Sequence, residues 1–206
     1  MEHRIRLSFG VEAPDKFTGH VEADETFIGG KARNMHVSKR ARRITGTGGK
    51  DKTAVMGILE RGKDGNVSRV RTTVIPNRKK KAIQAEVRKH VEAGAARYSD
   101  ALRSYDGLEE FQHQVVDHAV QYVNGKVHTN GLENFWSLLK RGINGTYGSV
   151  EPFHLFRYLD EQAYRFNNRK LTDAERFDAA VRKIVGKRIK YEQLIGNVEE
   201  PISLLQ

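Results

Sequence analysis

Three acidic residues stand where their carboxylates could hold metal ions. Asp24 lies inside a stretch that is otherwise apolar or β-branched, Asp100 where another such stretch ends, and Glu133 near the start of a helical pattern. Two Mg²⁺ or Mn²⁺ ions about 3.5–4 Å apart, held by carboxylate oxygens, can activate an attacking hydroxyl and stabilise a leaving oxygen. Any one acid taken alone is more often a solvated surface charge. Their joint context predicts catalytic residues that hold two Mg²⁺ or Mn²⁺ ions.

Neighbouring acids leave alternatives open. Strand alternation puts Glu22 and Asp24 on one face and Glu25 on the other, so Glu25 is the weaker candidate although it is adjacent. An acid inside an apolar strand needs a partner, which favours a specific role for Asp24. Asp106 replaces Asp100 as the candidate if the strand ends later.

Basic and polar residues near these acids are candidate contacts for DNA. Lys140 follows Glu133 by seven residues, so both side chains lie on one helix face, although the lysine alone could be a solvated charge. The other candidates are Arg141, Asn130, His128, Lys31, Arg33, Lys39, Arg40, Arg42, Arg43, Arg78, Lys79 and Lys80. A lone histidine such as His128 is more often structural, and Trp136 is more often core than a platform for stacked bases.

Composition and charge narrow the class of protein. The chain has 206 residues, 38% hydrophobic and 30% charged, which is enough for one domain with a buried core. It has no cysteine, which excludes disulfides, thiol catalysis and cysteine-based zinc modules. No stretch is apolar enough for a membrane helix or a signal peptide, so we expect a cytoplasmic protein without a membrane partner. The net charge of +10 makes nucleic acid the leading partner.

The pattern along the chain predicts the elements that position the acids. Five stretches rich in β-formers predict strands, over residues 17–29, 53–61, 67–75, 95–100 and 114–120. A helix over about 78–93, capped by Asn77, follows the third strand, and a short helix near 101–112 follows the fourth. This order predicts an α/β domain of ribonuclease H-like fold, with a mixed five-stranded sheet flanked by helices.

Two further regions have their own signals. The segment from Lys31 to Lys52 is basic and rich in glycine, without an apolar face, which suggests a mobile loop that contacts phosphate. From Asn130 onward, beyond the fifth strand, the chain is mostly helical. Helices are expected over 131–141, ending in a loop at Gly142, Gly145 and Gly148, from Pro152 to about Asn168, and after a cap at Thr172. We divide the chain into a catalytic domain over 1–170 and a helical C-terminal extension over 171–206.

Three blocks of the sequence resemble a known family. They are HVEADETFIGGK from His20, YSDALRSYDGL from Tyr98, and the block that begins HTNGLENFWSLLKRG at His128. With them, the chain over about residues 17 to 190 is similar to the catalytic domain of bacterial insertion-sequence transposases of the Asp-Asp-Glu type, of the ISXO2-like kind. The resemblance implies that Asp24, Asp100 and Glu133 are the acidic triad.

The resemblance also carries expectations about activity and partners. It implies a transposase that cleaves DNA by water and transfers strands through a 3′-hydroxyl, acting as a homodimer on transposon ends and target DNA. Some relatives have an asparagine at the third acidic position, which makes Asn130 an alternative to Glu133 as the third metal ligand, or a phosphate contact. Full-length members begin with a zinc ribbon and a helix-turn-helix, which we expect this chain to lack. The rival functions are a catalytically silent, domesticated DNA-binding core and a structure-specific nuclease of the same fold.

Overall fold

The computed structural model describes residues 2–10, 15–30, 35–44, 52–63, 65–100, 105, 107–116 and 129–197. Within these ranges it describes the backbone alone at residues 39, 42, 43, 97–100 and 112–116. In the described part, no helix is both long and apolar enough to cross a membrane.

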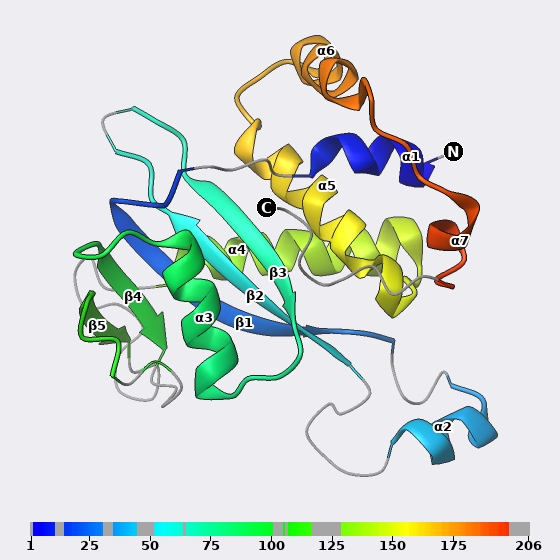
Figure 1. Ribbon diagram of the computed structural model, residues 1–206, viewed down its shortest axis with the longest axis horizontal. Coiled ribbons are helices and arrows are strands. Elements are labelled where there is room, and N and C mark those ends of the chain that lie inside the picture. Colours follow the sequence, from blue (N-terminus) through cyan, green and yellow to red (C-terminus); the bar gives the residue numbers. More distant parts are fainter. Residues whose placement is uncertain are drawn as a thin grey trace.

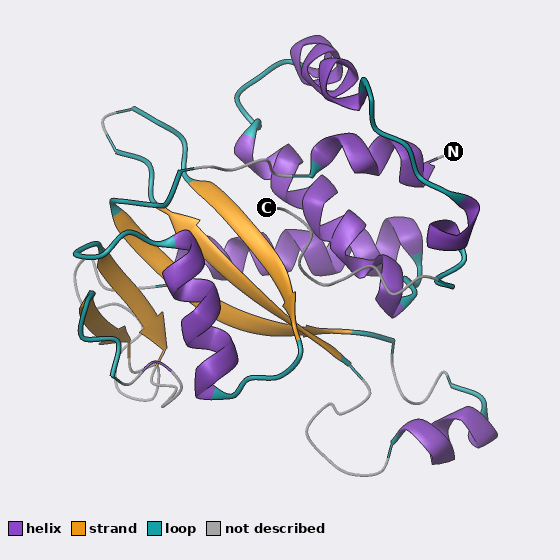
Figure 2. Ribbon diagram, in the orientation of Figure 1, coloured by secondary structure: helices purple, strands orange, loops and turns teal. Residues whose placement is uncertain are grey.

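The centre of the molecule is one mixed sheet (Figure 2). Its strands are β1 (His20–Ile28), β2 (Thr53–Glu60), β3 (Arg69–Ile75), β4 (Ala96–Asp100) and β5 (Gln112–Val116). The spatial order is β3-β2-β1-β4-β5, so the first strand lies in the middle. β2 pairs antiparallel with both β1 and β3, while β4 runs parallel to both β1 and β5. The predicted α/β class is confirmed.

Helices cover both faces of the sheet (Figure 1). The helices of the described residues are α1 (Glu2–Arg6), α2 (Val37–Arg43), α3 (Lys80–His90), α4 (Asn130–Arg141), α5 (Leu155–Asn167), α6 (Asp173–Ile184) and α7 (Tyr191–Leu194). Shorter elements lie next to these helices in the chain. They are 3-10 helices over Leu7–Phe9 and Pro152–His154 and a π-helix over Gly142–Tyr147. Figure 1 shows α3 on one face of the sheet and α4 and α5 on the other.

Two apolar clusters hold these layers together. On the α3 face, Ile83 and Val87 of the helix pack with strand residues of β1 and β2. On the other face, Leu132, Phe135, Trp136 and Leu139 of α4 are buried, at the spacing of a helix with one apolar stripe. Each such side chain stabilises the fold by about 1.5–3 kcal/mol, so α4 is firmly attached to the sheet.

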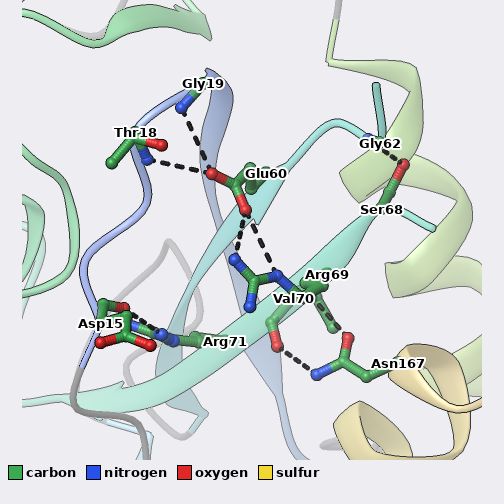
Figure 3. A network of polar contacts seen from close by, with 10 residues as sticks. All are labelled: Asp15, Thr18, Gly19, Glu60, Gly62, Ser68, Arg69, Val70, Arg71 and Asn167. Atoms are coloured by element: carbon green, nitrogen blue, oxygen red, sulfur yellow. Dashed lines mark hydrogen bonds and ion pairs between the residues drawn. The ribbon is translucent and has the colours of Figure 1, made fainter. Parts of the chain in front are cut away.

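One edge of the sheet, at β3, is contacted by α5, and a polar network lies beside it (Figure 3). Asn167 accepts a hydrogen bond from the Val70 amide at 2.7 Å and donates to the Val70 carbonyl at 3.0 Å. Nearby, Glu60 accepts hydrogen bonds from the amides of Thr18 and Gly19 and from Arg69. Burial alone would raise the pKa of Glu60, but these donors hold it below its ordinary value. The side-chain amide of Asn167 thus pairs with Val70 as a neighbouring strand would, which protects the edge at that residue.

Several expectations about the elements were wrong. The segment 31–52 contains α2 where a loop was expected, because its Lys, Arg and Ala favour helix even without an apolar face. The chain after Arg141 continues as the π-helix, and of Gly142, Gly145 and Gly148 only Gly148, at φ +69°, has the left-handed backbone that suits glycine. Residues 107–111 form turns instead of the end of a short helix, and the rest of 101–106 apart from Tyr105 lies outside the described residues.

Other boundaries moved by a few residues. α3 begins at Lys80 with Lys79 as its N-cap, while Asn77 accepts a hydrogen bond from the Lys79 amide. β5 begins at Gln112, two residues before the predicted start, and residues 117–120 are outside the described part. The predicted cap at Thr172 is confirmed, since Thr172 and Glu175 form a reciprocal capping box.

No pattern in the sequence predicts α1. This five-residue helix is held on α5 by Arg6, whose Nε lies 2.8 Å from Glu161 Oε2, with both side chains buried. Burial would raise the pKa of Glu161, but hydrogen bonds from Arg6, Arg165 and Tyr147 lower it. The division of the chain at residue 170 stays a prediction.

Candidate active site

The strand register brings two of the predicted acids together. β1 and β4 run parallel, and Ala23 lies opposite Ser99, so the next pair in the same register is Asp24 and Asp100. Neighbouring strands are about 4.8 Å apart, which puts these two backbone positions side by side. Asp100 is also the last residue of β4 and pairs with Val116 of β5. The side chain of Asp100 lies outside the described part.

The carboxylate of Asp24 is held by α4. Trp136 Nε1 donates a hydrogen bond of 2.9 Å to Asp24 Oδ2, and the indole is 5% exposed. The ring passes over Gly57, which is the partner of Asp24 in β2. A Cβ at position 57 would lie 2.5 Å from Trp136 Cζ2, so the close approach requires glycine there. Trp136 is a core residue, as expected, and it also orients the first acid.

A second carboxylate on the same strand fixes the start of α4. Glu22 is 1% exposed and accepts a 2.9 Å hydrogen bond from the Leu132 amide and a 2.7 Å bond from Arg61 Nε. The amides of a first helical turn lack partners within the helix, and a carboxylate is stabilised there. A Cβ on Gly131 would lie 2.8 Å from Glu22 Oε2, so a side chain at 131 would push the helix away. Glu22 and Asp24 therefore attach α4 to β1 at two points.

Glu133 lies in the turn between these attachment points. It follows the amide that Glu22 holds and precedes Trp136 by three residues, in the first turn of α4. Its side chain is exposed, and Thr129 Oγ1 lies 3.4 Å from its Oε1. Among the described side chains no group of three His, Asp or Glu could hold a metal ion. Because the side chain of Asp100 is outside that set, the triad stays a prediction.

The two faces of α4 divide as the sequence predicts. Glu133, Ser137 and Lys140 are exposed, whereas Leu132, Phe135, Trp136 and Leu139 are buried. Lys140 and Arg141 form the basic last turn of the helix, and Asn130 is its exposed first residue. The exposed face of α4 therefore carries an acid at one end and two cations at the other.

Comparison with known proteins identifies the family. A model of the ISXO2-like transposase domain matches residues 16–167. The chain belongs to this family. An uncharacterized transposase-like protein of Haemophilus influenzae is 31% identical over 105 residues, which is 50% of this chain and 85% of that protein. A chain in the solved structure of the simian T-cell lymphotropic virus intasome in complex with PP2A regulatory subunit B56 gamma is similar at a TM-score of 0.44 and 10% identity. The alignment covers 88% of this chain and 59% of that chain.

The remaining candidate DNA contacts of this transposase domain lie in separate places. Arg40 is exposed on α2, and Lys79 and Lys80 are exposed where α3 begins. Arg78 Nε lies 3.4 Å from Glu25 Oε2, which ties this arginine to the sheet. The side chains of Lys39, Arg42 and Arg43 on α2, and all of Lys31, Arg33 and His128, are outside the described part. Their contacts with DNA stay predictions.

Glu25 differs from Asp24 in its surroundings. Its side chain is 3% exposed and accepts a short hydrogen bond from the Tyr105 hydroxyl, besides the contact with Arg78. Tyr105 belongs to the apolar cluster on the α3 face, whereas Trp136, which bonds Asp24, belongs to the cluster on the α4 face. The expectation that Glu25 and Asp24 lie on opposite faces of β1 is confirmed, while the choice between them as metal ligands stays a prediction.

Sequence reasoning missed the residues that support the site in this transposase domain. Strand alternation places Glu22 on the face of Asp24 but does not reveal its role, and no pattern in the sequence singles out Arg61 or Gly131. One usable signal was Gly57, since a glycine inside the apolar strand TAVMGILE indicates that something approaches its backbone closely. The identity of the approaching group, Trp136, is not encoded locally.

Proposed function

We propose that this domain has a ribonuclease H-like fold and performs metal-dependent DNA strand cleavage and strand transfer. The observation that supports the proposal is the parallel register of β1 and β4: Ala23 pairs with Ser99, so Asp24 and Asp100 are the next residues along two neighbouring strands, and Asp24 accepts a hydrogen bond from Trp136 of α4. Membership of a transposase family supports the same reaction. The alternative of a silent DNA-binding core is weaker because all three acids of the motif are present.

The proposed ligands suit a hard cation. Asp24, Asp100 and Glu133 would offer only carboxylate oxygens, the donors that Mg²⁺ and Mn²⁺ prefer, and no softer side chain belongs to the set. When bound, two such ions would lower the pKa of the attacking hydroxyl and stabilise the leaving oxygen. Among the described residues, Trp136 would keep the Asp24 carboxylate in one orientation. Glu22 would keep the first turn of α4, and hence Glu133, over the strand.

The basic residues would bind the DNA backbone. Lys140 and Arg141 lie about two helical turns from Glu133, or roughly 10 Å along the axis, which suits a phosphate near the cleaved bond. α2 and the segment Arg78–Lys80 would hold flanking DNA by charge, as a net charge of +10 favours. In this scheme two copies act together on the transposon ends and the target.

A nicking assay with matched variants tests the proposal. Asp24→Asn and Glu133→Gln should lose nicking of a labelled duplex in Mn²⁺ while they still bind DNA, and Glu151→Gln, a change at an exposed acid outside the site, should nick as the parent does. Thermal unfolding checks that Asp24→Asn still folds, because that change alters the bond with Trp136. Nicking at the parental rate by both acid variants would overturn the proposal.

Product analysis separates a transposase from a nuclease of the same fold. Incubation of pre-cleaved ends with a supercoiled target plasmid should give joined products if the 3′-hydroxyl attacks target DNA. Nicked products without any joined molecules would support the nuclease instead.

A further inference from the structure

α6 carries an apolar stripe on its outer side. Phe177 is 71% exposed and Val181 44% exposed, and Val185, directly after the helix, is 81% exposed. Ala174, Phe177, Val181 and Ile184 follow the spacing three, four, three along the sequence, which is the seam pattern of a two-helix coiled coil. Figure 1 shows α6 at the periphery, away from the sheet.

Another side of α6 already has its partners within the chain. Ala180 is buried, and the Tyr164 hydroxyl of α5 donates a 2.6 Å hydrogen bond to the Arg176 carbonyl. Lys183 lies over the Tyr164 ring at 5.8 Å. The capping box of Thr172 and Glu175 fixes the start of the helix. The helix is thus anchored by one side, and its exposed stripe is a defined surface of the kind that marks protein contacts.

Charge along α6 indicates which partner fits this stripe. The first half holds Asp173, Glu175 and Asp178 with one arginine, while the end of α6 and the residues after it hold Arg182, Lys183, Lys187 and Arg188. A second α6 in the antiparallel direction would set the acidic half of each helix against the basic half of the other. A parallel pairing would set like charges together.

We propose that α6 is a homodimer contact, packed antiparallel against α6 of a second copy. Because Ala174, Phe177, Val181 and Ile184 are arranged symmetrically about position 179, the two-fold axis passes beside that position, with Phe177 of one copy against Val181 of the other. A 12-residue helix is only about 18 Å long, so the contact is smaller than the roughly 1,600 Å² of a standard interface and is weak in solution. On one DNA molecule, a role that rests on the proposed function, the two copies would meet at high effective concentration.

Self-association without DNA tests the contact apart from catalysis. In sedimentation equilibrium over a wide concentration range, the parent should dimerise weakly, and Phe177→Asp should weaken the association at least tenfold. Val37→Asp is the matched control, because Val37 is 69% exposed on α2 and lies outside the stripe, and it should associate as the parent does. A parent that stays monomeric at every concentration, or a Phe177→Asp variant that associates as the parent does, would overturn the proposal.

Disulfide trapping tests the direction of the pair, since the chain has no cysteine. A disulfide forms when the two Cα atoms are about 4.4–6.8 Å apart. In the antiparallel pair, position 177 of one copy faces position 181 of the other, so a mixture of the Phe177→Cys and Val181→Cys variants should give covalent mixed dimers, whereas Phe177→Cys alone should not. Covalent dimers from Phe177→Cys alone would indicate a parallel pair, and they, or the absence of mixed dimers, would contradict the antiparallel contact.

Discussion

Gly57→Ala should loosen the attachment of α4 to the sheet. The added Cβ would lie 2.5 and 2.7 Å from two carbons of the Trp136 ring and 2.9 Å from Leu132 Cδ2, all below ordinary contact distances. The indole would have to move by about 1 Å, since Cβ contacts normally exceed roughly 3.4 Å and the surrounding core is closely packed. That movement would also strain the bond from Trp136 to Asp24.

The expected loss of stability combines two effects. Overpacking of a core costs about 1–3 kcal/mol, and weakening the buried hydrogen bond to Asp24 adds about 1 kcal/mol. We expect the free energy of unfolding to fall by about 2–4 kcal/mol. Trp136 is the one tryptophan of the chain, so its fluorescence during urea denaturation reports the unfolding of this site directly.

A glycine in open surroundings provides the control. Gly30 has nothing within 4 Å of the position of a Cβ, so Gly30→Ala should change the free energy of unfolding by less than about 0.5 kcal/mol. Replacing Trp136 with Leu in the Gly57→Ala background should recover part of the loss, because the smaller side chain leaves room; circular dichroism follows the unfolding of this variant, which has no tryptophan. If Gly57→Ala were as stable as Gly30→Ala, the close packing of Trp136 on β2 would be refuted.

Three more predictions concern Glu22, Lys140 and Asp160. Glu22→Ala should lower the free energy of unfolding by about 2–3 kcal/mol in urea denaturation, because the Leu132 amide and Arg61 lose this buried acceptor; an unchanged midpoint would contradict it. Lys140→Ala should weaken DNA binding in fluorescence anisotropy yet leave Mn²⁺ affinity unchanged in calorimetry, and parental DNA affinity would make the lysine a mere solvated charge. Burial raises the pKa of Asp160 from 3.8 to about 7, so the stability it contributes is present below pH 3.8 and is lost as the pH rises through 7. Asp160→Asn should therefore flatten the dependence of Tm on pH in that window, and an unchanged profile would exclude this role.

The buried face of α4 and the cap of α6 could be predicted because apolar spacing and capping chemistry depend on residues close together in the sequence. The apolar spacing of α4 identified Leu132, Phe135, Trp136 and Leu139 as its buried face, and Thr172 was found from its capping chemistry. α2 has no apolar periodicity, so only the high helix propensity of its residues indicates a helix there.

Contacts between distant segments could not be predicted in this way. Trp136 and Asp24 are 112 residues apart, and their hydrogen bond depends on how α4 lies across β1. The same holds for Glu22, whose partner is a backbone amide that any residue at position 132 would supply. The neighbouring positions of Asp24 and Asp100 depend on a parallel register that no local signal encodes.

A crystal structure of the domain grown with Mn²⁺ and a DNA duplex would test the proposed metal site. We expect anomalous scattering peaks for two ions about 3.5–4 Å apart, bound by carboxylate oxygens of Asp24, Asp100 and Glu133. If the carboxylates of Asp24 and Asp100 lay more than about 10 Å apart in an ordered sheet, no metal pair could bridge them, and the proposed active site would be contradicted.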